Sequence, residues 1–176
     1  MQEYILLRPD HTHTDELYSY RAEFLASGDS MDGTGNLRKT EDMNEYIKHC
    51  ADCENEETLP AGLVTATQFV MVRKSDERIV GMIQIRHYFN DYLKVYGGHI
   101  GYSVRPSERR KGYAKKMLKM ALPVCREMGI KNILITCLAD NVASEKTIIA
   151  NGGVYESTVT EPNAGVELKR YWISID

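Results

Sequence analysis

A short basic segment is the part of this sequence best suited to chemistry. Residues 105–119 carry one acid, Glu108, against seven bases. The bases are Arg105, Arg109, Arg110, Lys111, Lys115, Lys116 and Lys119. We expect a strand to end near Val104 and a helix to begin at Arg109 or Arg110. Because the first N–H groups of a helix have no partners within it, the segment predicts a binding site for an anion, above all phosphate.

The small residues of this segment support the same interpretation. Gly112 has no side chain at a point where phosphate would approach the backbone, and Ala114 is nearly as small. Arg110, Lys111 and Lys115 can neutralise the bound charge. The alternative is an ordinary helix start that happens to be basic, because a run of charges is often a solvated helix face.

Three other motif-like patterns in the chain are incomplete. Gly28 and Gly33 have the glycine spacing of a P-loop, but Thr34 stands where that motif needs lysine. Residues 97–101 contain three glycines, yet they precede a strand. The CxxC pair at residues 50–53 stands alone, whereas a zinc site usually needs two such pairs. We therefore predict neither a metal site nor a redox site.

The hydrophobic pattern places the basic segment in a mixed α/β fold. Strands are expected at residues 4–7, 69–72, 79–88, 98–104, 133–138, 154–159 and 167–175. Helices are expected at 13–27, 41–53, 109–128 and from an N-cap at Asp140 or Asn141 to residue 151. Pro123 should kink or restart the third helix, and Gly129 suits its C-terminal cap. Residues 28–36 and 90–97 are predicted loops.

Length and composition indicate one domain that covers residues 1–176. With 43% hydrophobic and 27% charged residues, the chain can bury a core. No apolar stretch is long enough to span a bilayer, and the N-terminus lacks the residue order of a signal peptide. We therefore expect a cytoplasmic protein that does not act at a membrane, and its four cysteines fit a reducing compartment.

The net charge of −3 is unevenly distributed along the chain. Residues 1–58 hold 14 of the 25 acids and 5 of the 22 bases, so the rest of the chain is basic. A negative overall field disfavours nucleic acid as a partner. The acidic N-terminal third is compatible with a cationic ligand, although a solvated acidic surface explains it as well.

The basic segment resembles the GNAT acyl-CoA N-acyltransferases. Arg109-x-x-Gly112-x-Ala114 matches the (Gln/Arg)-x-x-Gly-x-(Gly/Ala) signature of that superfamily. Val104 stands five residues before the signature, as the family places its strand end. The order of strands and helices around the signature agrees with the same family.

A second motif extends the resemblance to about residues 65–160. Asn141-x-x-Ser144, followed by Gly152, matches the next segment of the family at the expected distance. The fold that this implies is an α/β, GNAT-like mixed sheet, mostly antiparallel, with a central splayed pair of parallel strands and flanking helices. The pair would be the strand that ends at Val104 and the strand at 133–138.

The resemblance implies that acetyl-CoA binds between these two strands. Backbone groups from Arg110 to Lys115 would hold the pyrophosphate, the region of Val104 would contact the pantetheine and the thioester oxygen, and Asn141 would reach the pantetheine arm. The cofactor-binding residues implied are Ser103, Val104, Arg109, Arg110, Lys111, Gly112, Tyr113, Ala114, Lys115, Asn141 and Ser144.

The usual catalytic acid and base of the family are missing. Ile148 stands where many relatives carry a tyrosine acid, and Thr136 stands where some place a glutamate base. His87 and Tyr102 are the candidate catalytic residues, with removal of the amine proton by water as the default. Strand alternation is expected to aim His99 away from the site.

The function implied is an N-acetyltransferase that moves an acetyl group from acetyl-CoA to a primary amine by direct attack. The acceptor is expected to be a small molecule or a peptide amine, and the protein a monomer or homodimer. The first two helices and residues 28–36, 52–57 and 90–96 are expected to shape the acceptor site. Because the usual acid and base are absent, a catalytically inactive sensor of CoA or acyl-CoA is the alternative.

Overall fold

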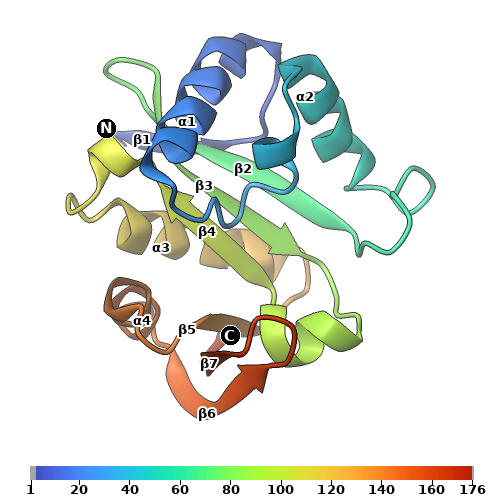
Figure 1. Cartoon of the computed structure of the whole chain (residues 1–176), viewed down its shortest axis with the longest axis vertical. Helices are drawn as coiled ribbons and strands as arrows, with labels where there is room; N and C mark the ends of the chain where they lie inside the picture. The colour runs from blue at the N-terminus through green and yellow to red at the C-terminus, as the bar shows by residue number, and fades with distance from the viewer. Residues whose placement is uncertain (1–2, 176) are drawn as a thin grey trace.

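The computed structural model describes residues 3–175, which form two antiparallel β-sheets surrounded by helices (Figure 1). The larger sheet has the order β1 (Tyr4–Leu7), β2 (Ala66–Arg73), β3 (Arg78–Arg86), β4 (Ile100–Val104). The smaller sheet has the order β5 (Asn132–Leu138), β7 (Val166–Ser174), β6 (Val154–Glu161). The helices are α1 (Thr14–Ser27), α2 (Met43–Asp52), α3 (Tyr113–Glu127) and α4 (Val142–Ile149).

Helices cover both faces of the larger sheet because its strands alternate between two apolar cores. Val70 and Met82 pack with buried residues of α1 and α2, among them Phe24. Their neighbours on the opposite face, such as Ile83, pack with Met117 of α3. Figure 1 shows α1 and α2 on one side of this sheet and α3 on the other.

The strand register aligns a polar row on the face that carries α1 and α2. Gln68 of β2 pairs with Gln84 of β3, and Gln84 pairs with Gly101 of β4. Gln68 is buried and donates to the carbonyl oxygen of Gly33 at 2.8 Å. This bond holds the α1–α2 loop against the sheet.

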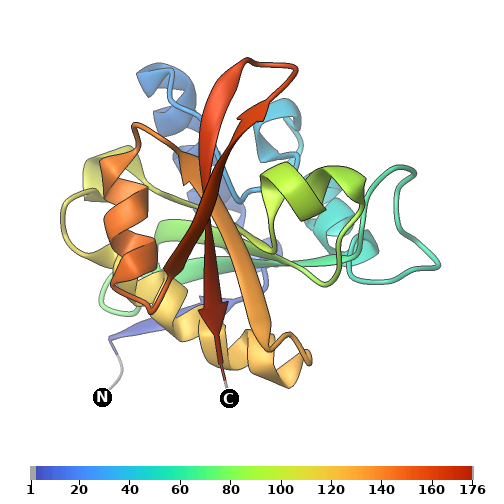
Figure 2. The same ribbon diagram turned by 90° about the horizontal axis from the view of Figure 1, so that it is seen from below.

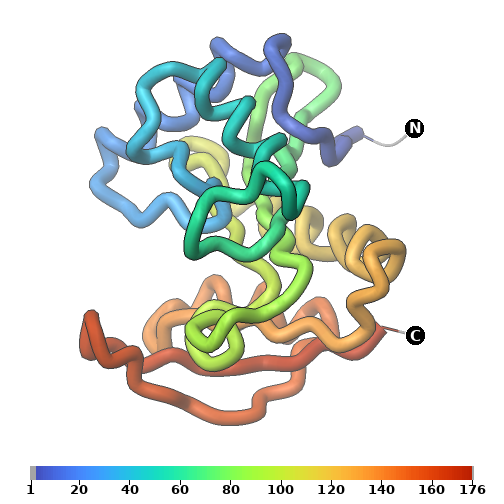
Figure 3. The backbone as a smooth tube through the Cα atoms, turned by 90° about the vertical axis from the view of Figure 1, so that its right-hand side faces the viewer, coloured from blue at the N-terminus to red at the C-terminus, as the bar shows by residue number. Residues whose placement is uncertain are grey.

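Within residues 3–175, β4 and β5 are linked at a single point just before β4 begins. Gly98 forms an isolated bridge with Ile135. The N–H of His99 donates to the carbonyl oxygen of Leu134 at 2.8 Å, and the N–H of Leu134 donates to Nδ1 of His99 at 3.0 Å. The central parallel pair expected from the sequence is not formed as a hydrogen-bonded pair, because β4 and β5 belong to separate sheets. Figure 3 shows the C-terminal strands below the larger sheet and its helices.

The expected elements are confirmed, with three differences of detail. First, α3 begins at Tyr113 and not at Arg109 or Arg110, because Arg110 and Gly112 have φ values of 63° and 80°, which a right-handed helix excludes. Second, residues 93–97 form a π-helical turn inside the expected loop. Third, α3 continues through Pro123 to Glu127.

The ends of α3 and α4 follow the expected caps. Gly129 adopts a left-handed conformation after α3, and the N–H of Ile130 donates back to Cys125. Asn141 caps α4 by accepting from the N–H of Ser144 at 3.0 Å. Figure 2 shows α4 and the turn at residues 93–97 on opposite sides of β6 and β7. No helix within residues 3–175 is long and apolar enough to cross a bilayer.

Candidate functional site

The loop between β4 and α3 presents a run of unused backbone donors. The N–H groups of residues 110–115 donate to no described atom, and the first helical bond of α3 joins Lys116 N–H to the carbonyl of Gly112 at 3.1 Å. No side chain caps this helix, and no atom lies within 4 Å of the position that a Cβ on Gly112 would take. Open donors at the positive end of a helix fit a phosphate group.

Two basic side chains of this loop bind the protein itself. The Arg109 guanidinium pairs with Asp29 at 2.6 Å and lies over the ring of Phe24. Lys111 pairs with Glu108 at 2.8 Å. Expected as cofactor-binding residues, these two therefore use their side chains to hold the loop in place.

The other basic side chains remain open to an anion. Arg110 and Lys115 are exposed and form no ion pair with a residue of the described chain. The first turn of α3 contains no acid. Ala114 is half-buried, whereas Tyr113 is buried and accepts a hydrogen bond from Arg73 at 3.0 Å. The loop thus combines free backbone donors with two free cations.

A buried carboxylate fixes the turn that precedes this loop. Glu108 closes the short helical turn Pro106–Glu108 and is bonded by Arg73 at 3.0 and 3.2 Å. Arg78 forms a further ion pair with it at 3.1 Å. Burial raises the pKa of Glu108, but the hydrogen bonds from Arg73 and Lys111 outweigh this, and the pKa lies below its usual value. The carboxylate is therefore charged at neutral pH.

Tyr102 of β4 and Ser144 of α4 connect these two elements through their hydroxyl groups. The Tyr102 hydroxyl lies 2.8 Å from Oγ of Ser144. Burial raises the pKa of Tyr102 to about 12, so the hydroxyl is protonated at neutral pH. Ser103 faces the opposite side, where its Oγ and its carbonyl oxygen each lie 3.0 Å from the Tyr20 hydroxyl. The carbonyl of Val104 accepts from Arg109 at 3.4 Å.

The structure does not bring His87 together with Tyr102. The two ring nitrogens of His87 lie 2.9 Å from the Thr67 hydroxyl and 3.0 Å from the Thr65 hydroxyl. Burial lowers the pKa of His87. Both ring nitrogens of His87 are thus occupied by threonine hydroxyls. Nδ1 of His99 is likewise occupied, because it accepts from the N–H of Leu134 in the link to β5.

Neutral, buried His99 predicts a sensitivity to acid. Burial lowers its pKa from 6.5 to about 4, so between these pH values the unfolded chain binds a proton that the folded chain does not. The free energy of unfolding should fall through this window by up to about 3 kcal/mol, with no contribution from His99 above it. Urea denaturation at pH 7 and pH 4.5 tests this against His99→Gln, which can still accept from Leu134. Equal losses in both proteins would contradict the prediction.

The CxxC pair lies at the C-terminal end of α2 as two free, buried thiols. Cys53 Sγ lies 3.5 Å from Nε2 of His49. Burial raises the pKa of Cys53, and it raises that of Cys50 to about 12. Both thiols are therefore protonated at neutral pH, whereas a metal ligand or nucleophile is a thiolate.

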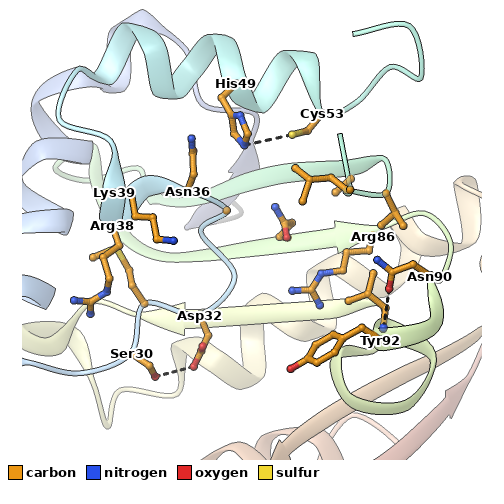
Figure 4. A pocket seen from close by; sticks show the side chains of 18 of the residues that line it. Ser30, Asp32, Asn36, Arg38, Lys39, His49, Cys53, Arg86, Asn90 and Tyr92 are labelled. Atoms are coloured by element: carbon orange, nitrogen blue, oxygen red, sulfur yellow. Dashed lines mark hydrogen bonds between the residues drawn. The ribbon is translucent and has the colours of Figure 1, made fainter. Parts of the chain in front are cut away.

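A cavity of about 910 Å³ lies on the α1–α2 face of the larger sheet (Figure 4). Its walls come from the α1–α2 loop, the end of α2, the start of β2, the end of β3 and the segment at 90–93. The lining includes residues of two segments expected to shape the acceptor site, 28–36 and 90–96. It does not extend to the acidic turn beyond Cys53.

Arg86 and Gln84 line this cavity, and neither belongs to a motif of the sequence. Both belong to β3, where polar residues at 84 and 86 alternate with buried Ile83 and Ile85. That alternation places both polar side chains on the α1–α2 face. The alternation of polar and apolar residues along β3 was therefore the sequence signal that could have identified Gln84 and Arg86.

Most of the sequence matches a known family. The profile of the acetyltransferase (GNAT) domain matches residues 5–154. The chain therefore belongs to the GNAT acetyltransferases, a family of acetyl-CoA-dependent N-acetyltransferases. A comparison with curated proteins finds no match.

Solved structures share the fold at low sequence identity. The ribosomal-protein-S5-alanine acetyltransferase of Vibrio fischeri has a TM-score of 0.71 and 14% identity, over 100% of this chain and 95% of that chain. The microcin C7 self-immunity acetyltransferase, solved with acetyl-CoA and AMP, has a TM-score of 0.71 and 19% identity, over 99% and 94%. A ribosomal L7/L12 α-N-protein acetyltransferase, solved with coenzyme A, has a TM-score of 0.71 and 18% identity, over 100% and 96%.

Proposed function

We propose that this protein transfers the acetyl group of acetyl-CoA to the primary amine of a small acceptor, by direct attack of the amine, and that residues 1–176 act as one domain. Acetyl-CoA supplies the acetyl group in an activated form, as a thioester. The observation that carries the proposal is the run of free N–H groups at residues 110–115, in an open loop with no acid in the first turn of α3. Such a loop suits the diphosphate of a coenzyme.

The residues of the chain divide the work of holding the coenzyme. The backbone of residues 110–115 would bind the diphosphate, while Arg110 and Lys115 neutralise its charge. Val104, Asn141 and Ser144 would line the pantetheine arm. We assign that arm to the region between β4 and β5. These two strands are not hydrogen-bonded to each other beyond the link at Gly98, and we propose that they splay apart there to admit the arm.

Tyr102 is assigned the role of a hydrogen-bond donor to the departing sulfur. With a pKa raised to about 12 by burial, its hydroxyl can donate at neutral pH but is a poor base. A backbone N–H of β4 near Val104 is the candidate donor to the thioester oxygen. Proton removal from the amine falls to water, because β4 carries no carboxylate and both nitrogens of His87 are bonded to threonines.

Calorimetric titration with acetyl-CoA, beside a thiol-release assay with a panel of amines, tests the proposal. Binding of acetyl-CoA together with amine-dependent release of CoA would support it. Dephospho-CoA and adenosine serve as controls for the parts of the coenzyme that are recognised. Binding without release by any amine would favour the inactive sensor, and absence of binding would refute the assignment of the loop.

Reversing the charge of Arg110 is expected to weaken acetyl-CoA binding at least tenfold. Arg110→Glu places an anion beside the free N–H groups, where it repels a diphosphate, and a factor of ten corresponds to about 1.4 kcal/mol. Lys131→Glu is the matched control, since Lys131 is exposed in the turn between α3 and β5. Titration calorimetry should show normal affinity for the control, and equal affinities in the two variants would count against the site.

A further inference from the structure

The cavity on the α1–α2 face is lined by cations that lack carboxylate partners within the described chain. They are Arg38, Lys39 and Arg86. Lys39 donates no hydrogen bond to a described residue, and Arg38 donates to a backbone carbonyl. Figure 4 shows Lys39 and Arg86 extending into the cavity from opposite walls. The lining is therefore richer in free positive charge than the acidic N-terminal third of the sequence suggests.

Arg86 is the most constrained of these cations. Its Nη1 donates to the carbonyl oxygens of Gly97 and Gly98, both at 3.2 Å, while Nε and Nη2 donate to no described atom. Its Nη2 lies 3.3 Å from the position that a Cβ on Gly101 would take, so the guanidinium stands directly beside β4. A partly buried charge is costly unless an anion pairs with it. The free edge of this guanidinium is suited to a carboxylate or phosphate.

The acids that line the cavity are Asp29 and Asp32. Asp29 is already paired with Arg109 at 2.6 Å. Asp32 accepts from the Ser30 hydroxyl at 2.8 Å and forms no ion pair within 4 Å in the described chain, although its charge acts on Arg86 and opposes the lowering of the Arg86 pKa by burial. Asp32 directly precedes Gly33, which touches β4 so closely that a Cβ there would lie 2.1 Å from the carbonyl oxygen of Gly101. One free carboxylate thus lies beside β4.

A second polar group in the lining also lacks a partner. The side-chain oxygen of Asn36 is buried and accepts no hydrogen bond from a described residue. An ammonium or amide donor would satisfy it. The cavity volume of about 910 Å³ lies within the range of small-molecule sites. Charge, hydrogen bonding and size together describe a small ligand with a positive end and a negative end.

We propose that the acetyl acceptor is a small amine that also carries an anionic group, carboxylate or phosphate, as an amino acid does. Its anionic group binds Arg86 and Lys39, and its ammonium end lies toward Asp32 before it loses a proton and attacks. The proposal rests on the acetyl transfer proposed above and names the class of acceptor for that reaction. It also explains why unpaired cations surround a site at which an amine reacts.

Matched pairs of amines test this acceptor class. The pairs are β-alanine with propylamine, and phosphoethanolamine with ethanolamine, assayed by thiol release with saturating acetyl-CoA. We expect kcat/KM to be at least tenfold higher for the anionic member of one pair or both, and the better pair distinguishes carboxylate from phosphate. Equal values within both pairs would overturn the proposal.

Two variants locate the preference in the cavity. Lys39→Ala and Arg86→Gln should each reduce the preference for the anionic amine at least fivefold, chiefly through KM. Lys74→Ala is the control, because Lys74 lies in the turn at the opposite end of the β2–β3 hairpin. Arg86→Gln could disturb the turn at 93–97, so Lys39→Ala, which removes no side-chain hydrogen bond or ion pair within the described protein, keeps the test independent of folding.

Titration with acetyl-CoA separates this inference from the function on which it rests. Both variants should bind acetyl-CoA with unchanged affinity. A preference that survives in both would overturn the assignment of Lys39 and Arg86. Failure of the unmodified protein to bind acetyl-CoA would instead refute the proposed acetyl transfer.

Discussion

Replacing Tyr102 with phenylalanine is expected to lower kcat about a hundredfold while acetyl-CoA affinity stays within about threefold. Removal of one fixed donor to a developing negative charge typically costs a factor of this order. The hydroxyl is half-buried on β4 and bonded at 2.8 Å to Ser144, so its position is already fixed. Steady-state thiol release and calorimetric titration measure the two quantities separately.

The control for this prediction is the same substitution, tyrosine to phenylalanine, at a tyrosine away from the site. Tyr155 is exposed on β6, where its hydroxyl contacts Thr158 at 2.9 Å. Tyr155→Phe should leave kcat unchanged. If Tyr102→Phe raises KM for acetyl-CoA and leaves kcat intact, Tyr102 supports the binding site and does not act on the sulfur.

The pH profile gives Tyr102 a second, independent test. A hydroxyl whose pKa is raised to about 12 stays protonated across the working range, so its donation should not titrate between pH 6 and 9. If the kcat profile of Tyr102→Phe keeps every inflection of the unmodified protein, the result agrees with Tyr102 as a hydrogen-bond donor. Loss of an acidic limb in the variant would identify Tyr102 as a base and contradict the assignment.

Local signals predicted the elements of this fold well. Gly129 and Asn141 are the caps expected of them, because capping depends on residues next to the helix end. The continuous apolar run at 133–138 became the buried strand β5. The start of α3 was placed too early, because nothing in the sequence announces that Arg110, which is not glycine, takes a left-handed conformation.

Contacts between segments that are distant along the chain could not be predicted from the sequence. The backbone of the β4–α3 loop was expected to bind phosphate, yet the pairing of Arg109 with Asp29 joins residues 80 positions apart. Arg86 and Lys39 meet in one cavity only because the α1–α2 loop docks on the sheet through Gly33. Motif spacing carries no information on such docking, so the cavity had no signature that a motif search could find.

Replacing Arg105 with methionine is expected to destabilise the fold by about 3–5 kcal/mol, the usual cost of removing one partner from a buried ion pair. The Arg105 side chain is 0% exposed. It donates to Glu16 at 2.8 Å, to Glu23 at 3.0 Å and to the carbonyl of Ile79 at 2.7 Å. Urea denaturation at neutral pH gives the change in the free energy of unfolding.

The source of this cost can be identified by also neutralising Glu16 and Glu23, the two carboxylates that pair with Arg105. In the triple variant Arg105→Met, Glu16→Gln, Glu23→Gln, no buried charge is left without a partner, so the loss should be smaller than in Arg105→Met alone. Equal losses would mean that packing and the bond to Ile79 dominate.

Arg105 also connects α1 to the β4–α3 loop, which we propose to bind the diphosphate, through Glu23. The other oxygen of that carboxylate accepts from the N–H and the hydroxyl of Ser107, at 3.2 and 2.8 Å. Because Ser107 lies in the turn before the free N–H groups, Arg105→Met should weaken acetyl-CoA binding as well as stability. Titration below the melting temperature tests this, and unchanged affinity would show that Glu108 and its cations hold the loop without help from α1.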